Sequence, residues 1–167
     1  GNALQKIAKY DEAIASYNQA IQLKPDYIEA HNNLGNALNE LGNFEEAIAC
    51  FTQAIKVGPN YVEAHNNMGN ALNGLGRREE AILSYTEAIK LDPSYTAAHY
   101  NLGNALKEHG KYEEAVVSFT QAIRLKSDFA EAHNNMGMAL HLQGRFLEAK
   151  AAYKLGIAIN SKPGITH

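Results

Sequence analysis

Glycine recurs at a fixed spacing of 34 residues, at Gly1, Gly35, Gly69, Gly103 and Gly137. Periods of about 20 to 50 residues are typical of solenoid proteins, in which each unit buries its apolar face only against its neighbours. A single globular core needs no such regularity. The period therefore predicts a repeat architecture and argues against most enzyme folds.

Residues 28–61 show what one repeat contains. A first helix is predicted over 28–41, because apolar or small residues follow the three-and-four spacing of one helix face: Ala30, Leu34, Ala37, Leu38 and Leu41. Gly42 is typical of the residue just past a helix C-terminus. A second helix is predicted over 44–57, with acids in its first turn and Pro59 after its end. Each repeat is thus expected to be a helix-turn-helix hairpin.

The same pattern recurs in 62–95, 96–129 and 130–163, with a partial copy in 1–27 and a tail in 164–167. We therefore predict a single domain over 1–167, an all-α solenoid of about 4.8 repeats. Gly1 falls in mid-repeat, so we expect the sequence to be part of a longer protein. The partial copy offers a first helix of only about seven residues. Its Leu4 and Ile7 should be exposed, which predicts fraying or pairing with another molecule.

Charge and hydropathy exclude two kinds of partner. The net charge is -3, and the positive side chains are separated by repeats and interleaved with glutamates. Nucleic-acid binding needs a concentrated positive surface, so we predict none. No apolar run approaches the roughly 18 residues that a membrane-spanning helix needs, so no membrane insertion is expected.

Cys50 is the only cysteine, so an internal disulfide is excluded. The chain also contains no Asn-X-Ser/Thr sequon, and together these features predict an intracellular, cytoplasmic protein. Other repeats carry a small residue in place of Cys50, namely Ser16, Ser84, Ser118 and Ala152. We interpret Cys50 as a packing residue and not as a nucleophile.

The shared positions closely resemble those of the tetratricopeptide repeat: Leu34-Gly35, Leu38, Ala47, Phe51, Ala54 and Pro59, repeated in register along the chain. The resemblance implies a right-handed solenoid whose first helices line a concave groove. Gly35 and Ala47 would let two helices approach closely, while Phe51 fills the gap between hairpins. Two departures are a histidine at the fourth repeat position and serine in place of the last two prolines, at Ser127 and Ser161, where looser turns are expected.

The repeated histidines are His31, His65, His99 and His133. Packed helices lie about 8–10 Å apart, whereas zinc requires ligands at about 2 Å from one ion. One histidine per repeat therefore cannot converge on a metal, and we predict no metal and no cofactor. Each imidazole should be half-buried, with one nitrogen bonded to a neighbouring polar group.

Asparagine is in excess on the first helices, although it costs up to about 0.7 kcal/mol per site relative to alanine. Two interpretations remain open. The amides could bond one another along the stack, or they could grip the backbone of an extended peptide, because an amide offers a donor and an acceptor without charge. We favour peptide or partner binding, at Asn32, Asn33, Asn36, Asn39, Asn66, Asn67, Asn70, Asn73, Tyr100, Asn101, Asn104, Lys107, Asn134, Asn135 and Met138.

Differences between repeats should give this groove its specificity. Tyr100 replaces an asparagine, Lys107 replaces Asn39 and Asn73, and Gly74 is expected to open space where other repeats carry glutamate. The groove acids outnumber its cations, which favours a neutral to basic peptide.

The string Asn-Leu/Met-Gly-Asn-Ala-Leu, at 33–38, 67–72 and 101–106, resembles repeats of O-linked N-acetylglucosamine transferases. In that family an asparagine ladder contacts the peptide main chain, and by position Asn33, Asn67, Asn101 and Asn135 match it. A substrate-recognition role beside a glycosyltransferase domain is therefore one alternative. Chaperone-binding tetratricopeptide domains grip a carboxylate with cations, which are missing at the equivalent positions Asn32, Asn66 and Asn134.

The last repeat departs most from the pattern. Met138, Leu142 and Leu147 stand where polar residues stood before. Apolar residues at an open end predict contact with a following segment, another domain or a second copy. Self-assembly into a homo-oligomer through the solenoid ends is thus a third hypothesis beside the main one, a non-catalytic protein-binding scaffold.

Overall fold

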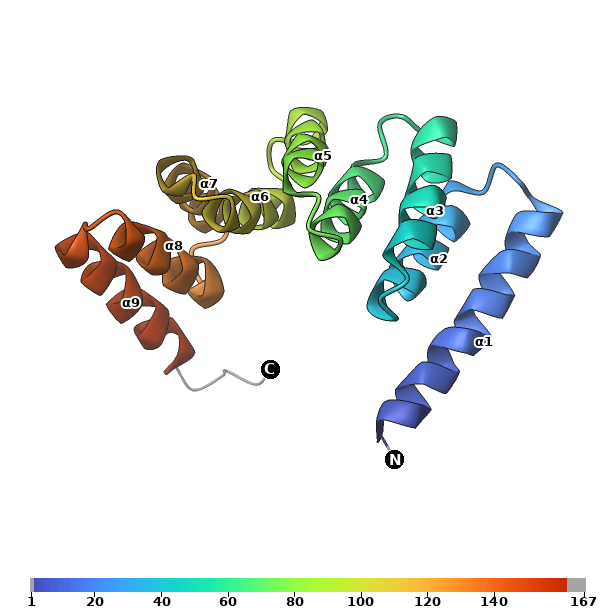
Figure 1. Cartoon of the computed structure of the whole chain (residues 1–167), viewed down its shortest axis with the longest axis horizontal. Coiled ribbons are helices and arrows are strands. Elements are labelled where there is room, and N and C mark those ends of the chain that lie inside the picture. Colours follow the sequence, from blue (N-terminus) through green and yellow to red (C-terminus); the bar gives the residue numbers. More distant parts are fainter. Residues whose placement is uncertain (1, 162–167) are drawn as a thin grey trace. The chain divides into compact units, whose positions relative to one another are not determined.

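The computed structural model describes residues 2–161, with side chains from Lys9 onward. Within this range the chain is all-α and contains no strand, as predicted (Figure 1). Its helices are α1 (Asn2–Leu23), α2 (Ile28–Glu40), α3 (Phe44–Val57), α4 (Val62–Gly74), α5 (Arg78–Leu91), α6 (Thr96–Glu108), α7 (Tyr112–Leu125), α8 (Ala130–Leu142) and α9 (Phe146–Asn160). The tail in 164–167 and the side chains of Leu4 and Ile7 lie outside the described residues.

The helices form two compact units that divide between Pro93 and Ser94. In the first unit, α2 pairs with α3 and α4 with α5, while α1 packs on α2 and the hairpins stack through α3 and α4. In the second unit, α6 pairs with α7 and α8 with α9, and α7 packs on α8. Each unit is therefore a stack of helical hairpins, which confirms the predicted solenoid architecture.

A glycine in the left-handed region ends the first helix of each complete hairpin. Gly42 has a φ of 81°, and the Asn43 N–H donates to the Leu38 carbonyl at 2.9 Å. The Gly42 N–H donates to the Asn39 carbonyl at 3.0 Å, which completes a Schellman motif. Gly76, Gly110 and Gly144 repeat this conformation, with φ of 75°, 80° and 78°. The second helix therefore begins two residues after each glycine.

The partial first copy differs from the prediction. Asn2–Leu23 is one continuous helix of 22 residues, not a short helix followed by a turn and a second helix. Ala8 stands 34 residues before Gly42, where the other copies place their left-handed glycine. That conformation costs a residue with a Cβ roughly 1–2 kcal/mol, so the helix continues through Ala8.

Aromatic rings of the second helices lie directly against the periodic glycines. A Cβ added at Gly35 would lie 2.6 Å from Phe51 Cε1, and one added at Gly69 would lie 2.5 Å from Tyr85 Cε1. Phe51 is fully buried and belongs to one core cluster with Ala47 and with Ala71 of the next hairpin. The periodic glycine thus makes room for a ring within its own hairpin.

Gly74 does not open free space. A Cβ at this position would lie 2.6 Å from Phe44 Cε1, so the ring of Phe44 in α3 already fills the place. The expectation of a widened groove at Gly74 is therefore wrong. The glycine instead accommodates the preceding hairpin.

Two of the repeated histidines tie helix to turn. His31 Nε2 donates to the Pro25 carbonyl at 2.8 Å, and His65 Nε2 donates to the Pro59 carbonyl at 2.9 Å. Both bonds confirm the predicted contact of one ring nitrogen with a neighbouring polar group. His133 follows a serine turn and is 7% exposed, and its Nδ1 has no hydrogen-bond partner among residues 2–161.

Candidate functional site

The predicted binding residues lie on the first helices, but their exposure varies. Asn33 and Met138 are exposed, whereas Asn32 and Asn66 are each only 4% exposed. These two amides face their neighbours and cannot meet a partner directly, which corrects the expectation for both. The others are half-buried: Asn36, Asn39, Asn67, Asn70, Asn73, Tyr100, Asn101, Asn104, Lys107, Asn134 and Asn135.

In the first unit, amides of α2 and α4 bond one another across the repeat. Asn67 Nδ2 donates to Asn32 Oδ1 at 3.1 Å. Asn66 Nδ2 donates to Asn67 Oδ1 at 3.2 Å, and Asn32 Nδ2 lies 3.5 Å from Asn33 Oδ1. The buried pair Asn32 and Asn66 therefore holds the more accessible pair Asn33 and Asn67 in place.

Asn67 keeps hydrogen-bonding capacity beyond this network. A side-chain amide has two N–H donors and two acceptor lone pairs. Asn67 uses one donor toward Asn32 and one acceptor toward Asn66. Within the part of the chain that the structure describes, one N–H and one lone pair of Asn67 remain, which is the pair that a passing peptide unit requires.

Two further amides of the first helices, Asn70 and Asn39, differ in their hydrogen bonding. Tyr85 Oη donates to Asn70 Oδ1 at 2.9 Å, so α5 helps to orient this side chain of α4. Asn39 Oδ1 is buried and has no hydrogen-bond partner among the described residues.

We call the surface formed by Asn33, Asn36, Asn67 and Asn70 on α2 and α4 the asparagine face.

The second unit builds the same type of bond from different residues. Asn135 Nδ2 donates to Tyr100 Oη at 2.9 Å and to Asn104 Oδ1 at 3.0 Å. Lys107 Nζ lies 3.4 Å from Asn135 Oδ1. Tyr100 thus provides the acceptor that Asn32 provides to Asn67 in the first unit. Because both hydrogens of Asn135 are used, this amide has less capacity for a partner than Asn67 has.

Tyr100 is further held by aromatic neighbours. Its ring centroid lies 4.7 Å from that of Phe129 and 6.0 Å from that of Phe119. Such contacts and the half-burial of the ring restrict its motion. The tyrosine is therefore part of the packing of the second unit as well as a candidate contact.

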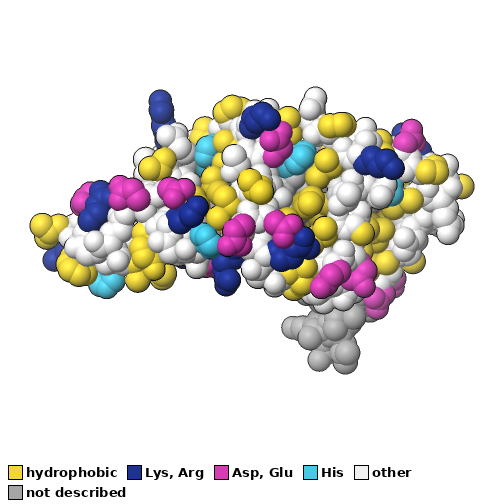
Figure 2. Space-filling view, turned by 45° about the horizontal axis from the view of Figure 1, so that its top comes forward, with side chains coloured by type: hydrophobic (Ala, Val, Ile, Leu, Met, Phe, Trp, Pro, Cys, Tyr) yellow, Lys and Arg dark blue, Asp and Glu magenta, His cyan; other side chains and the backbone are white. Residues whose placement is uncertain are grey.

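The charges near these residues are mixed. Glu29 and Glu63 are exposed on first helices of the first unit, and Glu108 and Glu131 on those of the second, where Lys107 is half-buried. On the face seen in Figure 2, acidic and basic side chains of the described residues are interspersed, and neither sign gathers into a patch.

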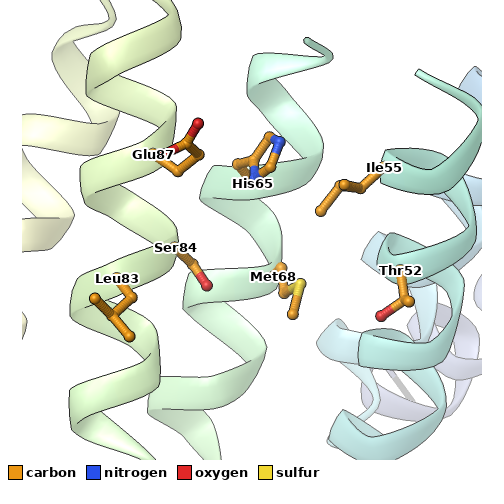
Figure 3. Close-up of a pocket in the computed structure, with 7 residues that line it drawn as sticks. All are labelled: Thr52, Ile55, His65, Met68, Leu83, Ser84 and Glu87. Atoms are coloured by element: carbon orange, nitrogen blue, oxygen red, sulfur yellow. The ribbon is translucent and has the colours of Figure 1, made fainter. Parts of the chain in front are cut away.

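A hollow of about 410 Å³ lies among α3, α4 and α5, and sequence reasoning missed it. Figure 3 shows Thr52 and Ile55 from α3, His65 and Met68 from α4, and Leu83 and Glu87 from α5 around it. Leu83 is 68% exposed at its edge. This gives the first unit a second, more apolar candidate surface for a partner.

The same hollow recurs in the second unit, with a volume of about 360 Å³. Its lining includes Thr120 and Met136, which stand 68 residues after Thr52 and Met68. Leu155 stands where the first hollow has Glu87, so the second hollow is less polar at that edge. Recurrence of threonine and methionine at these positions was the available sequence signal.

Apolar side chains are exposed on α8 and α9, as predicted from the last repeat. Leu147 is 86% exposed, Phe146 is 61% exposed and Leu142 is 51% exposed. The Phe146 ring lies edge-on to His141, with centroids 5.1 Å apart. The second unit thus presents an apolar surface to solvent at its last hairpin.

Among residues 2–161, no three histidine, cysteine or acidic side chains gather in the way a metal ion requires. None of the helices in this range is both long enough and apolar enough to cross a membrane.

Cys50 should react slowly with alkylating reagents. Burial raises the pKa of its thiol above the usual 9.0, and the charge of Glu46 raises it further. The thiolate is the reactive form, so a raised pKa lowers reactivity at neutral pH. With iodoacetamide at pH 7.5 we expect a slower reaction than that of glutathione, and the difference should narrow as the pH rises past 9. A Cys50→Ser variant, which has no thiol, measures the background reaction. A rate for Cys50 at or above that of glutathione would contradict its interpretation as a half-buried packing residue.

Solved structures with the same fold are similar over most of the chain. One described as MamA is 24% identical, with a TM-score of 0.86, over 93% of this chain and 91% of that one. YrrB, described as a TPR protein with an unusual peptide-binding site, is 22% identical, with a TM-score of 0.77, over 96% of this chain and 83% of that one. TTC0263, a TPR protein of Thermus thermophilus, is 23% identical, with a TM-score of 0.74, over 97% of this chain and 89% of that one. A comparison with curated proteins gives no match.

Family models match along the chain in the register of the repeats. A model described as TPR repeat matches residues 1–42, 35–76, 69–110 and 103–144. A second model, described as tetratricopeptide repeat, matches residues 130–163. The chain therefore belongs to the tetratricopeptide repeat family.

Proposed function

We propose that this protein is a non-catalytic scaffold that binds an extended peptide or a partner helix along its first helices. The contacts would come from the asparagine face in the first unit and from Tyr100, Asn101, Asn104, Lys107 and Met138 in the second. Affinity would be spread over several repeats, and the exposed glutamates favour a neutral to basic partner.

The observation that carries this proposal is the bonding of Asn67. Its amide is oriented by Asn32 and Asn66, yet it keeps one donor and one acceptor. A peptide backbone offers one N–H and one carbonyl per residue, so such an amide can pair with it irrespective of sequence. Orientation in advance lowers the entropy that binding must overcome.

The similarity to YrrB adds support at the level of the fold. That protein is described as having an unusual peptide-binding site. A family of stacked hairpins that includes a peptide binder makes peptide binding a reasonable function for these surfaces.

Substitution of Asn67 and Asn101 by alanine tests the proposal. A library of extended peptides is displayed, binders to the unchanged protein are selected, and their affinity for the double variant is measured. Each lost hydrogen bond costs about 0.5–1.5 kcal/mol, and the Asn67 amide alone can offer two, so the double variant should bind about tenfold more weakly.

The matched control is Asn60→Ala, because Asn60 is an exposed asparagine in a turn between helices. It should bind the selected peptides as the unchanged protein does. If the double variant keeps its helical circular dichroism spectrum and binds the peptides with unchanged affinity, the amides stabilise the fold and do not bind the peptide.

A second proposal, self-assembly, is favoured by the exposed apolar side chains of the last hairpin. Phe146, Leu147 and Leu142 lie together in sequence around the turn between α8 and α9. Exposed apolar surface of this kind is typical of contacts with another molecule. Light scattering over a range of concentrations should show association that Leu147→Lys reduces, and a monomer at every concentration would refute it.

An alternative function is the selection of substrates for a glycosyltransferase. The support for this alternative is the repeated sequence string at 33–38, 67–72 and 101–106 alone. A glycosyltransferase domain encoded in the same reading frame would establish this alternative, and its absence from the full gene would remove it.

A further inference from the structure

The hollow among α3, α4 and α5 is lined by hydroxyl groups that can accept hydrogen bonds but have no hydrogen left to donate. Thr52 Oγ1 donates to the Ile48 carbonyl at 2.8 Å, and Ser84 Oγ donates to the Glu80 carbonyl at 3.0 Å. Both hydroxyl hydrogens are thus engaged within their own helices. Only the lone pairs of these oxygens remain for a ligand.

The other two polar residues of the lining, His65 and Glu87, are also acceptors. His65 Nε2 donates to the Pro59 carbonyl at 2.9 Å, which leaves Nδ1 of the neutral ring with a lone pair. The Glu87 carboxylate has no hydrogen to donate and adds a negative charge. Figure 3 shows Glu87 and His65 toward one end of the hollow and Met68 and Leu83 toward the other. A complementary ligand therefore supplies hydrogen-bond donors and a positive charge.

Glu87 is only loosely paired within the chain. Lys90 Nζ lies 3.2 Å and 3.3 Å from its two carboxylate oxygens, and the Lys90 side chain is 73% exposed. Such exposed pairs contribute little free energy, because water screens the charges and both side chains lose freedom. A cation that enters the hollow can therefore compete with Lys90 for the carboxylate.

Apolar side chains make up the rest of the hollow. Ile55, Met68 and Leu83 line it, and Leu83 is 68% exposed at its edge. A lysine side chain matches both parts, because it joins an aliphatic stem to an ammonium group with three donors and no acceptor. Since the edge is open, the backbone that carries this lysine can stay outside the hollow.

The corresponding hollow of the second unit lacks the acidic end. Ala152 and Leu155 stand 68 residues after Ser84 and Glu87. Arg145 also lines this second hollow, and its guanidinium donates to Glu148 at 2.7 Å and 2.8 Å. The second hollow thus has a cation of its own, and a lysine is expected only in the first.

We propose that the hollow among α3, α4 and α5 binds a lysine side chain of a partner protein. The aliphatic stem packs on Met68 and Leu83, and the ammonium donates to Glu87, with His65 Nδ1 as a further acceptor. An apolar neighbour of the lysine fills the rest of the volume of about 410 Å³. No lining residue of this hollow belongs to the asparagine face, so the site goes beyond the binding of an extended peptide there.

The probe is the peptide acetyl-Leu-Lys-Leu-amide. Its matched control carries Nε-acetyl-lysine, which keeps the stem and removes the charge. Binding to the full 167-residue chain is followed by NMR of isotope-labelled methionine methyl groups. Met68 lines the first hollow and Met136 lines the second, so one spectrum reports on both. Substitution of each methionine by leucine assigns the signals.

The Met68 signal should shift and reach saturation with the lysine peptide. The acetylated peptide should bind there at least about tenfold more weakly, because it loses the hydrogen bonds between charged groups. The Met136 signal should not distinguish the two peptides. No shift of Met68, or equal affinity of the two peptides at Met68, would overturn the proposal.

Glu87→Gln should abolish the preference for the lysine peptide. The matched control is Glu79→Gln, which removes the same charge from an exposed position of α5 outside the hollow and should keep the preference. Lys90→Gln should strengthen binding of the lysine peptide, since it frees the Glu87 carboxylate. An unchanged preference in Glu87→Gln would contradict the assignment.

This site and the asparagine face can be tested separately. Loss of extended-peptide capture in the double variant of Asn67 and Asn101 should leave the Met68 response to the lysine peptide unchanged. Conversely, Glu87→Gln should leave extended-peptide capture by the asparagine face intact. Failure of one hypothesis is therefore distinguishable from failure of the other.

Discussion

Phe119→Ala should lower the free energy of unfolding by about 3–5 kcal/mol, because it removes a fully buried ring from the second unit. The ring fills the space above Gly103, where a Cβ would lie 2.6 Å from Phe119 Cε1. It also lies beside Tyr100, with ring centroids 6.0 Å apart. Alanine would leave a cavity that close-packed helices cannot fill by relaxation. Urea denaturation followed by circular dichroism measures the loss.

Phe119→Tyr is the matched control. Other repeats carry Tyr17, Tyr85 and Tyr153 at this position, and Tyr85 Oη bonds to Asn70 at 2.9 Å. The position therefore accepts a hydroxyl, and we expect a change below about 1.5 kcal/mol. A larger loss for tyrosine than for alanine would contradict this packing.

Gly69→Ala should destabilise the first unit by about 1–3 kcal/mol, which is the opposite of its effect in an ordinary helix. In an exposed helix interior, alanine is favoured over glycine by about 1 kcal/mol. Here the added Cβ would lie 2.5 Å from Tyr85 Cε1 and 2.7 Å from its Cδ1. The ring cannot retreat, because Tyr85 is 2% exposed. The free-energy cost of the overlap between the added Cβ and the Tyr85 ring should therefore exceed the gain in helix propensity from alanine.

A double-mutant cycle isolates the contact between glycine and ring. In a Tyr85→Leu background the ring is absent, so Gly69→Ala should become neutral or stabilising. The coupling energy should fall within about 0.5–3 kcal/mol, as for residues in direct contact. If Gly69→Ala has the same cost in both backgrounds, the glycine is required for another reason.

The helices could be predicted from the sequence because their determinants are local. The predicted second helix over 44–57 agrees with α3 at both ends, and Gly42 ends the first helix as expected. The exception at Ala8 follows from the same physics, since no glycine stands there to turn the chain. The role of Gly74 could not be predicted, because it depends on where the Phe44 ring of another hairpin lies.

The candidate site was only partly predictable. The 34-residue spacing placed the asparagines on the first helices, but it could not show which amides are buried. The bond from Asn67 to Asn32 depends on how one hairpin is rotated against the next. The replacement of asparagine by Tyr100 predicts a change of specificity, yet the tyrosine hydroxyl also provides the acceptor for Asn135 Nδ2. Hollows among three helices depend on side-chain size and rotamer, which periodicity does not report.

The central claim is that the asparagine face contacts the partner, and side-chain amide NMR tests it most directly. Each asparagine has its own pair of Nδ2 resonances, which alanine substitution assigns one by one. On addition of a selected extended peptide, the resonances of Asn33 and Asn67 should shift strongly, while those of exposed Asn60 should not. Shifts confined to Asn60 and other residues away from α2 and α4 would contradict the account, and would assign the amide network to stacking alone.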